Sequence, residues 1–209
     1  AAHAGAPGLL EPLRISLDIS VQHAVEDELR AAAQQFGAKG AAGVILDVNT
    51  GEVLAAASLP PVDPADRTQS LDPARLDKLA DGVYELGSIF KTLTIAMALE
   101  AGTADLDKIY DVRAPLHVGR YIIRDPYPVG RPLSVREIFV RSSNVGAGML
   151  ALELGSERQR AYLERFGLIK PIRSEAGPIA APKLPRRWGK AETITIAYGH
   201  GLAVAPLQF

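Results

Sequence analysis

The sequence predicts an α+β fold, in which one helix and a β-hairpin precede a mostly helical block. Residues 21–36 carry apolar side chains at helical spacing. Residues 43–48 and 52–58 are two strand-like runs joined by Asn49-Thr50-Gly51, whose Asn and Gly suit a hairpin turn. Downstream of residue 84 most periodic segments have helical spacing. Because a two-stranded ribbon is marginal alone, helices must cover it or further strands must follow in the chain.

The N-terminal part is expected to contain little regular structure before the first helix. Residues 1–12 are rich in Ala, Gly and Pro and are predicted to be a tail or linker, so the folded domain is assigned to residues 13–209. Residues 13–18 are predicted to form a short strand. Ser20 is expected to cap the first helix and Gly37 to end it.

The middle of the chain is predicted to alternate between loops and helices. Residues 59–80 contain four prolines and are expected to form a long surface loop. A helix that begins near Ser88 should end near Gly102, and a short hairpin is expected at 117–123. The helix from Ser88 is apolar nearly all round, which predicts that it is central and buried.

Two capping boxes are predicted in the C-terminal half. Ser134 and Ser156 are each followed three residues later by Glu or Gln, the pattern in which both side chains satisfy backbone groups at a helix start. Residues 168–190 are expected to form a loop. The helices expected in this half are 135–141, 145–154 and 157–166.

Composition excludes several classes of function. The 209 residues have a net charge of −1, which gives no electrostatic case for binding nucleic acid or an anionic membrane surface. The absence of cysteine excludes disulfides and cysteine chemistry. The four histidines show no metal spacing, and no stretch of 18 apolar residues predicts a membrane span. We therefore expect neither metal nor cofactor.

Ser88 and Lys91 form the first candidate catalytic pair. Positions i and i+3 share a helix face, so the two side chains can touch. Serine is a poor nucleophile until a base takes its proton, and lysine serves as that base only where a dry site destabilises its ammonium. The alternative is an N-cap serine beside a surface lysine, since this spacing arises by chance in about one such sequence in three.

Ser142 and Asn144 lie between two predicted helices, 51 residues after Lys91. Alone they are explained as caps of the following helix. Together with Gly87-Ser88-Ile89-Phe90-Lys91, they match the S-x-x-K and S-x-N boxes of penicillin-recognising serine enzymes. The segment Tyr198 to Gln208 resembles the glycine-rich landmark of class B penicillin-binding proteins, and the hairpin 45–55 is also typical of them. The resemblance covers residues 13–209 and is strongest to the septal peptidoglycan transpeptidases of cell division.

The resemblance implies a role for each matching residue. Ser88 corresponds to the nucleophile that the D-Ala-D-Ala stem peptide, or penicillin as its mimic, acylates. Lys91 corresponds to the base, and Ser142 to the hydroxyl that relays a proton to the leaving amine. Asn144 corresponds to the side chain that holds Lys91 and the substrate amide. The Ser88 backbone N–H at a helix start is expected to form half of an oxyanion hole.

The resemblance also implies a fold, a function and a cellular place. The fold is the penicillin-binding transpeptidase and serine β-lactamase type, an antiparallel sheet flanked by helices. The function is D,D-transpeptidation of peptidoglycan stem peptides, carried by lipid-linked precursor, at the division septum. β-Lactam antibiotics and divisome proteins are expected partners. The expected location is the periplasmic face of the bacterial inner membrane, with an anchor upstream of this chain.

The sequence departs from the family pattern in three places. Leu86 stands where many relatives have proline, and Ala205 where threonine is common; neither change removes a functional group. No lysine is followed by Ser-Gly or Thr-Gly, the third box, which supplies carboxylate binding and the second oxyanion N–H. We therefore expect a transpeptidase fragment that stops before its last strands, is inactive alone and folds poorly because a sheet edge is exposed.

Two other functions fit part of the pattern. A class D-like β-lactamase or penicillin sensor shares the S-x-x-K box, but would usually carry valine at the position of Asn144. A non-catalytic divisome scaffold fits the absence of the third box. We expect His200 to have a structural role and Glu85 to be a surface charge. The basic run 183–190 is expected to be a solvated loop.

Overall fold

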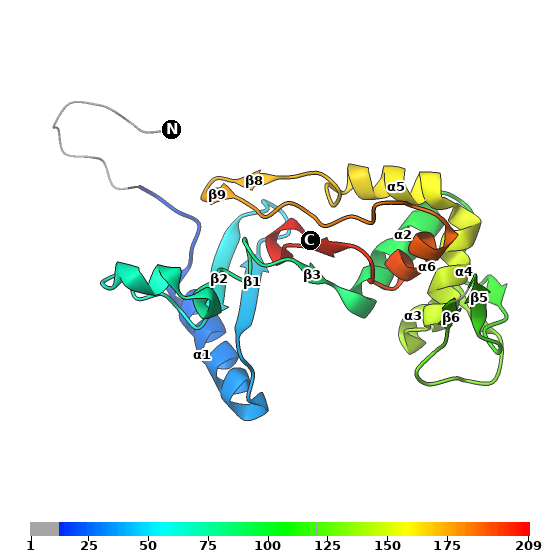
Figure 1. Ribbon diagram of the computed structural model, residues 1–209, viewed down its shortest axis with the longest axis horizontal. Coiled ribbons are helices and arrows are strands. Elements are labelled where there is room, and N and C mark those ends of the chain that lie inside the picture. The colour runs from blue at the N-terminus through cyan, green and yellow to red at the C-terminus, as the bar shows by residue number, and fades with distance from the viewer. Residues whose placement is uncertain (1–12, 120) are drawn as a thin grey trace. The chain divides into compact units, whose positions relative to one another are not determined.

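The computed structural model describes residues 13–119 and 121–209. These residues form two compact units that divide after Arg75 (Figure 1). None of the helices in the described ranges is long and apolar enough to cross a membrane.

The first unit begins with helix α1 (Ile19–Phe36). Its N-cap is Asp18, whose carboxylate accepts hydrogen bonds from the backbone N–H groups of Ser20 and Val21, so the prediction of Ser20 as the cap was wrong. Residues 13–18 form no strand, which corrects a second prediction. Gly37 ends α1 as predicted, with the left-handed backbone (φ 59°) that glycine adopts without strain.

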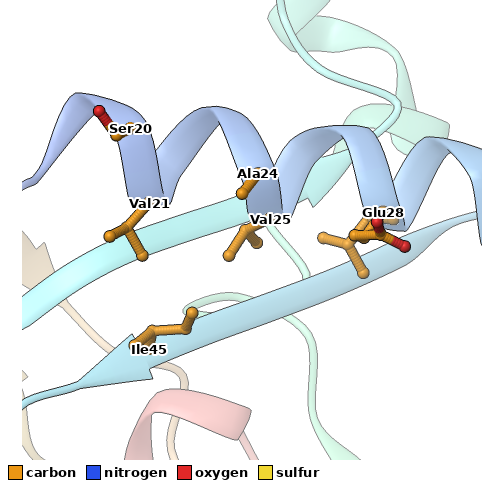
Figure 2. Close-up of a pocket in the computed structure, with 7 residues that line it drawn as sticks. Ser20, Val21, Ala24, Val25, Glu28 and Ile45 are labelled. Carbon is orange, nitrogen blue, oxygen red and sulfur yellow. The ribbon is translucent and has the colours of Figure 1, made fainter.

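Helix α1 lies beside the predicted hairpin of β1 (Ala41–Leu46) and β2 (Val53–Leu59), which pair antiparallel (Figure 1). The Asp47 carboxylate accepts from the N–H groups of Asn49 and Thr50 and so shapes the turn. The Gln22 amide bonds to both backbone groups of Ala56, at 3.0 and 2.9 Å, which fixes α1 to β2. A shallow groove remains between α1 and β1, lined mainly by Val21, Ala24, Val25, Leu29 and Ile45 (Figure 2).

The segment predicted as a long loop contains two short 3₁₀ helices, Arg67–Leu71 and Pro73–Arg75. Asp66 caps the first with its side chain, which accepts from the Thr68 N–H. Aspartate side chains thus give local order to a proline-rich segment without making it a regular element.

The second unit is built around helix α4 (Asn144–Leu154), which contacts α2, α3, α5 and α6. Gly146 and Gly148 of α4 make this close packing possible, because a Cβ on them would lie 2.5 Å from Ile138 and 2.9 Å from Ile194. The neighbouring helices are α2 (Lys91–Glu100), α3 (Val135–Arg141), α5 (Ser156–Arg165) and α6 (Lys190–Ala197). Sequence patterns did not predict α6.

Helix α2 is less buried than predicted. Lys91, Thr94, Ile95, Met97 and Ala98 are buried against the rest of the unit. The opposite side is exposed, and its residues are Thr92, Ala96, Leu99 and Glu100. An apolar sequence therefore did not guarantee burial all round, because only one side of α2 meets neighbouring helices.

The described residues of the second unit form four antiparallel pairs of short strands. The predicted hairpin at 117–123 is β5 (Leu116–Val118) with β6 (Tyr121–Ile123). A small hairpin lies in the segment predicted as loop, formed by β8 (Arg173–Ser174) and β9 (Gly177–Pro178). Two pairs join distant segments: β4 (Ile109–Tyr110) with β7 (Leu133–Ser134), and β3 (Tyr84–Glu85) with β10 (Ala203–Val204).

The β3–β10 pair brings two glycine turns into contact. Gly87 N donates to Gly199 O at 3.1 Å. Gly199 has a φ of +88°, and a Cβ built on it would lie 1.9 Å from Gly87 O. Only glycine permits this approach of the two backbones.

The two predicted capping boxes have different outcomes. The box at Ser134 is present: its Oγ accepts from Glu137 N, and Glu137 Oε2 accepts from Ser134 N. The box at Ser156 is absent, since Gly155 is the N-cap and no side chain caps this helix. Gln159 is buried; its Nε2 donates to Thr193 O, and its Oε1 accepts from Trp188 Nε1. The side chain that the local pattern assigned to the cap therefore makes tertiary hydrogen bonds instead.

The two serines provide a matched test of these caps. We expect Ser134→Ala to lower the free energy of unfolding by about 1 kcal/mol, because the Glu137 N–H loses the Ser134 Oγ that accepts its hydrogen bond. Ser156→Ala should change it by less than about 0.5 kcal/mol, since Ser156 caps no helix and alanine is a good helix former. Urea unfolding followed by circular dichroism measures both values, and equal losses would contradict the assignment.

The Gly87–Gly199 contact predicts an unequal cost for two alanine substitutions at positive φ. Gly199→Ala should lower the free energy of unfolding by more than about 3 kcal/mol, because the new Cβ overlaps Gly87 O. Gly167→Ala is the control: Gly167 also has a positive φ (+77°), but its Cβ would meet no atom within 4 Å. The control should lose only the backbone term of about 1–2 kcal/mol. Equal losses in urea unfolding would argue against the close approach.

Candidate active site

Ser88 lies in a short 3₁₀ turn, Gly87–Phe90, that joins β3 to α2. Gly87 enters this turn with a φ of +60°, and Phe90 anchors it in the core with 1% of its surface exposed. Ser88 itself is exposed. The turn therefore holds the Ser88 hydroxyl at the surface, while the buried Phe90 side chain anchors the turn in the core.

Lys91 occupies the first turn of α2, with 1% of its surface exposed. Its Nζ lies 3.0 Å from Ser88 Oγ, as the i, i+3 spacing predicted. The same Nζ lies 2.9 Å from Ser142 Oγ and 2.7 Å from Ser142 O. The structure therefore brings together three of the four predicted residues around one amine.

Ser142 reaches Lys91 with two of its atoms because of its backbone conformation. It ends α3 with φ 55° and ψ 43°, and among the described residues it is the one non-glycine position with positive φ. The left-handed conformation costs a serine about 1–2 kcal/mol. Strain of this kind persists where the surrounding contacts enforce it, and it is often found at functional sites.

The surroundings of Lys91 lower its pKa from the ordinary 10.5 to about 8. Desolvation is the main cause, because burial disfavours the ammonium. The negative charge of Asp125 acts in the opposite direction and raises the pKa. A neutral lysine is therefore accessible near neutral pH, which is the requirement for a lysine base.

The hydrogen-bond geometry around Nζ fits both protonation states. An ammonium has three N–H donors, and the three neighbouring oxygens accept one each. A neutral amine has two N–H donors and a lone pair. The two donors can serve the two oxygens of Ser142, which leaves the lone pair for the hydroxyl hydrogen of Ser88.

The fourth candidate residue, Asn144, has a hydrogen-bond partner of its own. It is the first residue of α4, and its Nδ2 donates to Arg124 O at 3.4 Å. The hydrogen bonds described for Lys91 Nζ go to Ser88 and Ser142, and the role of Asn144 in holding Lys91 stays a prediction. This bond joins the start of α4 to the loop that contains Arg124.

Asp125 is a site residue that sequence reasoning missed. Its carboxylate accepts from Ser143 Oγ at 2.7 Å, Asn144 N at 2.6 Å and Val145 N at 2.9 Å. The N-cap of α4 is Ser143, whose Oγ also accepts from Gly146 N, so neither Ser142 nor Asn144 is the cap that the alternative interpretation proposed. No local pattern marks Asp125, which lies in a loop 18 residues before its partner.

Glu85 was also assigned only a surface role, yet it bridges two segments beside Ser88. Its Oε1 accepts from Gly201 N at 2.7 Å, and its Oε2 lies 2.9 Å from His200 Nδ1. The Gly201 N–H, and then the His200 side chain, lower the pKa of Glu85. Because a carboxylate only accepts, His200 Nδ1 carries a hydrogen, which supports the structural role predicted for this histidine.

The chain is also similar in sequence to known proteins. The model of the penicillin binding protein transpeptidase domain matches residues 41–209. A probable peptidoglycan D,D-transpeptidase FtsI of Caulobacter vibrioides is 39% identical over 196 residues, which is 94% of this chain and 33% of the relative. The peptidoglycan D,D-transpeptidase FtsI of Escherichia coli K12 is 31% identical over 200 residues, with the same two shares. The chain thus spans about one-third of the length of these curated relatives.

Solved structures agree with the sequence comparisons. The transpeptidase domain of Burkholderia pseudomallei penicillin-binding protein 3 superposes with a TM-score of 0.80 at 28% identity, over 97% of this chain and 57% of that one. A protein of Burkholderia ambifaria described as a peptidoglycan glycosyltransferase gives a TM-score of 0.81 at 28% identity, over 93% and 58%. The predicted α+β transpeptidase fold is therefore confirmed, and the chain belongs to the family of penicillin binding protein transpeptidase domains.

Proposed function

We propose that this chain is part of a peptidoglycan D,D-transpeptidase that forms stem-peptide cross-links at the division septum through a serine acyl-enzyme. The observation that carries the proposal is the position of the buried Lys91 side chain, whose Nζ lies 3.0 Å from Ser88 Oγ and 2.9 Å from Ser142 Oγ. Serine, lysine and serine in this arrangement can move a proton on and off a nucleophile without histidine.

In the proposed acylation, one proton moves from Ser88 to Lys91 and then through Ser142 to the leaving group. Neutral Lys91 takes the hydroxyl proton of Ser88 while Ser88 Oγ bonds to the carbonyl carbon of the penultimate D-alanine. The Ser88 backbone N–H stabilises the oxyanion that forms. The bond to the terminal D-alanine then breaks, and its amine receives the proton from Lys91 through the Ser142 hydroxyl. This leaves an ester on Ser88.

The second half of the reaction reverses these transfers. An amino group of a neighbouring stem peptide attacks the ester carbonyl and gives up a proton through Ser142 and Lys91. Ser88 leaves with a proton returned by Lys91, and a new amide bond joins the two peptides. The same route explains inhibition by penicillin, whose acyl group would remain on Ser88.

The proposal includes a cellular setting. The substrate is peptidoglycan, so the reaction belongs at the periplasmic face of the inner membrane. Membrane attachment through a segment outside this sequence, and contacts with other division proteins, are part of the proposal and are supported by the similarity to relatives named FtsI.

Labelling with fluorescent penicillin tests the nucleophile. In the full-length protein we expect covalent labelling that survives denaturation and is lost in Ser88→Ala, because the ester oxygen is removed. Ser156→Ala is the control and should label like the wild type, since Ser156 lies in α5 outside the site. Labelling that persists in Ser88→Ala would refute the assignment of Ser88, and rapid release of hydrolysed product would favour a β-lactamase.

The lowered pKa of Lys91 predicts the pH dependence of acylation. Below its pKa of about 8 the side chain is an ammonium without a lone pair and cannot accept the Ser88 proton. The second-order rate constant should therefore rise about tenfold per pH unit up to about pH 8 and then level off. Rates measured with a fluorescent penicillin from pH 6 to 10 provide the test.

Lys91→Arg gives the control for this profile. The guanidinium keeps the positive charge but does not deprotonate in this range, so acylation should be lost at every pH. A wild-type profile that stays flat from pH 6 to 10, or an active Lys91→Arg, would contradict the role of Lys91 as base.

A further inference from the structure

Asp125 joins the loop after β6 to the start of α4. Within the described part of the chain, its carboxylate accepts three hydrogen bonds from consecutive residues, at Ser143 Oγ, Asn144 N and Val145 N. Two of these donors are backbone groups in the first turn of α4, where a carboxylate is favoured by the helix dipole. The carboxylate therefore fixes the chain immediately after Ser142.

Fixing this turn determines where the Ser142 oxygens lie. The left-handed conformation of Ser142 points both its O and its Oγ at Lys91 Nζ. On its other side, Ser142 is held by α3, since its N–H donates to Phe139 O at 3.0 Å. Asp125 supplies the matching restraint from the α4 side, without which the strained residue could relax toward negative φ.

Asp125 also acts on Lys91 through its charge. Its negative charge favours the Lys91 ammonium and raises the pKa of Lys91, against the effect of burial. The carboxylates of the helices packed on α2 are paired with other groups: Glu137 of α3 with Arg131, and Glu153 of α4 with Lys108. The flanking Arg124 and Arg141 are exposed, as is Glu100 of α2.

We propose that Asp125 is a positioning residue of the acylation, which holds the Ser142–Asn144 turn in register with Lys91 and provides the negative charge that stabilises the Lys91 ammonium as it forms. This inference rests on the proposed function. Burial disfavours the Lys91 ammonium, and the negative charge of Asp125 partly compensates this effect when Lys91 takes the proton of Ser88. The two effects together set the strength of the base.

The test is the pH profile of acylation by fluorescent penicillin in the full-length Asp125→Asn variant. The amide keeps the shape but removes the charge and part of the accepting capacity. We expect the midpoint of the profile to fall by about one pH unit and the limiting rate to fall on the order of tenfold. Asp107→Asn is the matched control: it removes the same charge from a side chain that is 89% exposed, and both parameters should stay at the wild-type values.

The midpoint distinguishes this role from a merely structural one, which would lower the rate and leave the midpoint in place. An unchanged midpoint in folded Asp125→Asn therefore overturns the inference. If that variant does not fold, Asp125→Glu decides: the retained charge should keep the midpoint while the displaced carboxylate lowers the limiting rate, and a wild-type rate would overturn the inference. Absence of labelling in the wild type would instead refute the proposed function.

Discussion

The burial of one lysine is the constraint on which the rest of this site depends. Lys91 has 1% of its surface exposed, and an ammonium that is removed from water must be hydrogen-bonded or give up its proton. Here both outcomes are available, since three oxygens surround Nζ and desolvation lowers its pKa to about 8. The balance between these two states makes the side chain suitable as a base.

Several local features of the second unit that cost backbone strain or conformational freedom lie around the elements that carry Ser88, Lys91 and Ser142. Ser142 adopts a left-handed backbone, Gly199 approaches Gly87 more closely than any side chain allows, and α4 carries glycines at its helix contacts. Each feature costs conformational freedom or strain, and each lies between elements that position Ser88 or Ser142. Asp125 and Glu85 add carboxylates that bind the backbone beside these two serines. The site is therefore held from both sides by short-range contacts between segments distant in sequence.

The sequence predicted best where the determining interactions are local. The hairpin turn, the Gly37 stop, the Ser134 capping box and the Ser88–Lys91 spacing all depend on residues within a few positions of each other, and the structure contains them. Prediction failed where a distant partner competes. The Gln159 side chain bonds to Thr193 and Trp188 instead of forming the expected cap. Helix α6 was missed because its sequence has no clear amphipathic stripe, although its buried residues make it part of the packing around α4.

By itself, the sequence determined the family and the α+β class and pointed to the candidate side chains of the S-x-x-K and S-x-N boxes. These motifs and their order can be read directly from the chain. It also placed Ser88 and Lys91 on one helical turn, since that geometry follows from the backbone alone. Only the tertiary structure decided that Ser142 meets Lys91 with two oxygens, that Asp125 and Glu85 belong beside the site, and that Lys91 is dry enough to lose its proton. These properties arise from burial and from contacts between segments 18 to 116 residues apart, which no local pattern encodes.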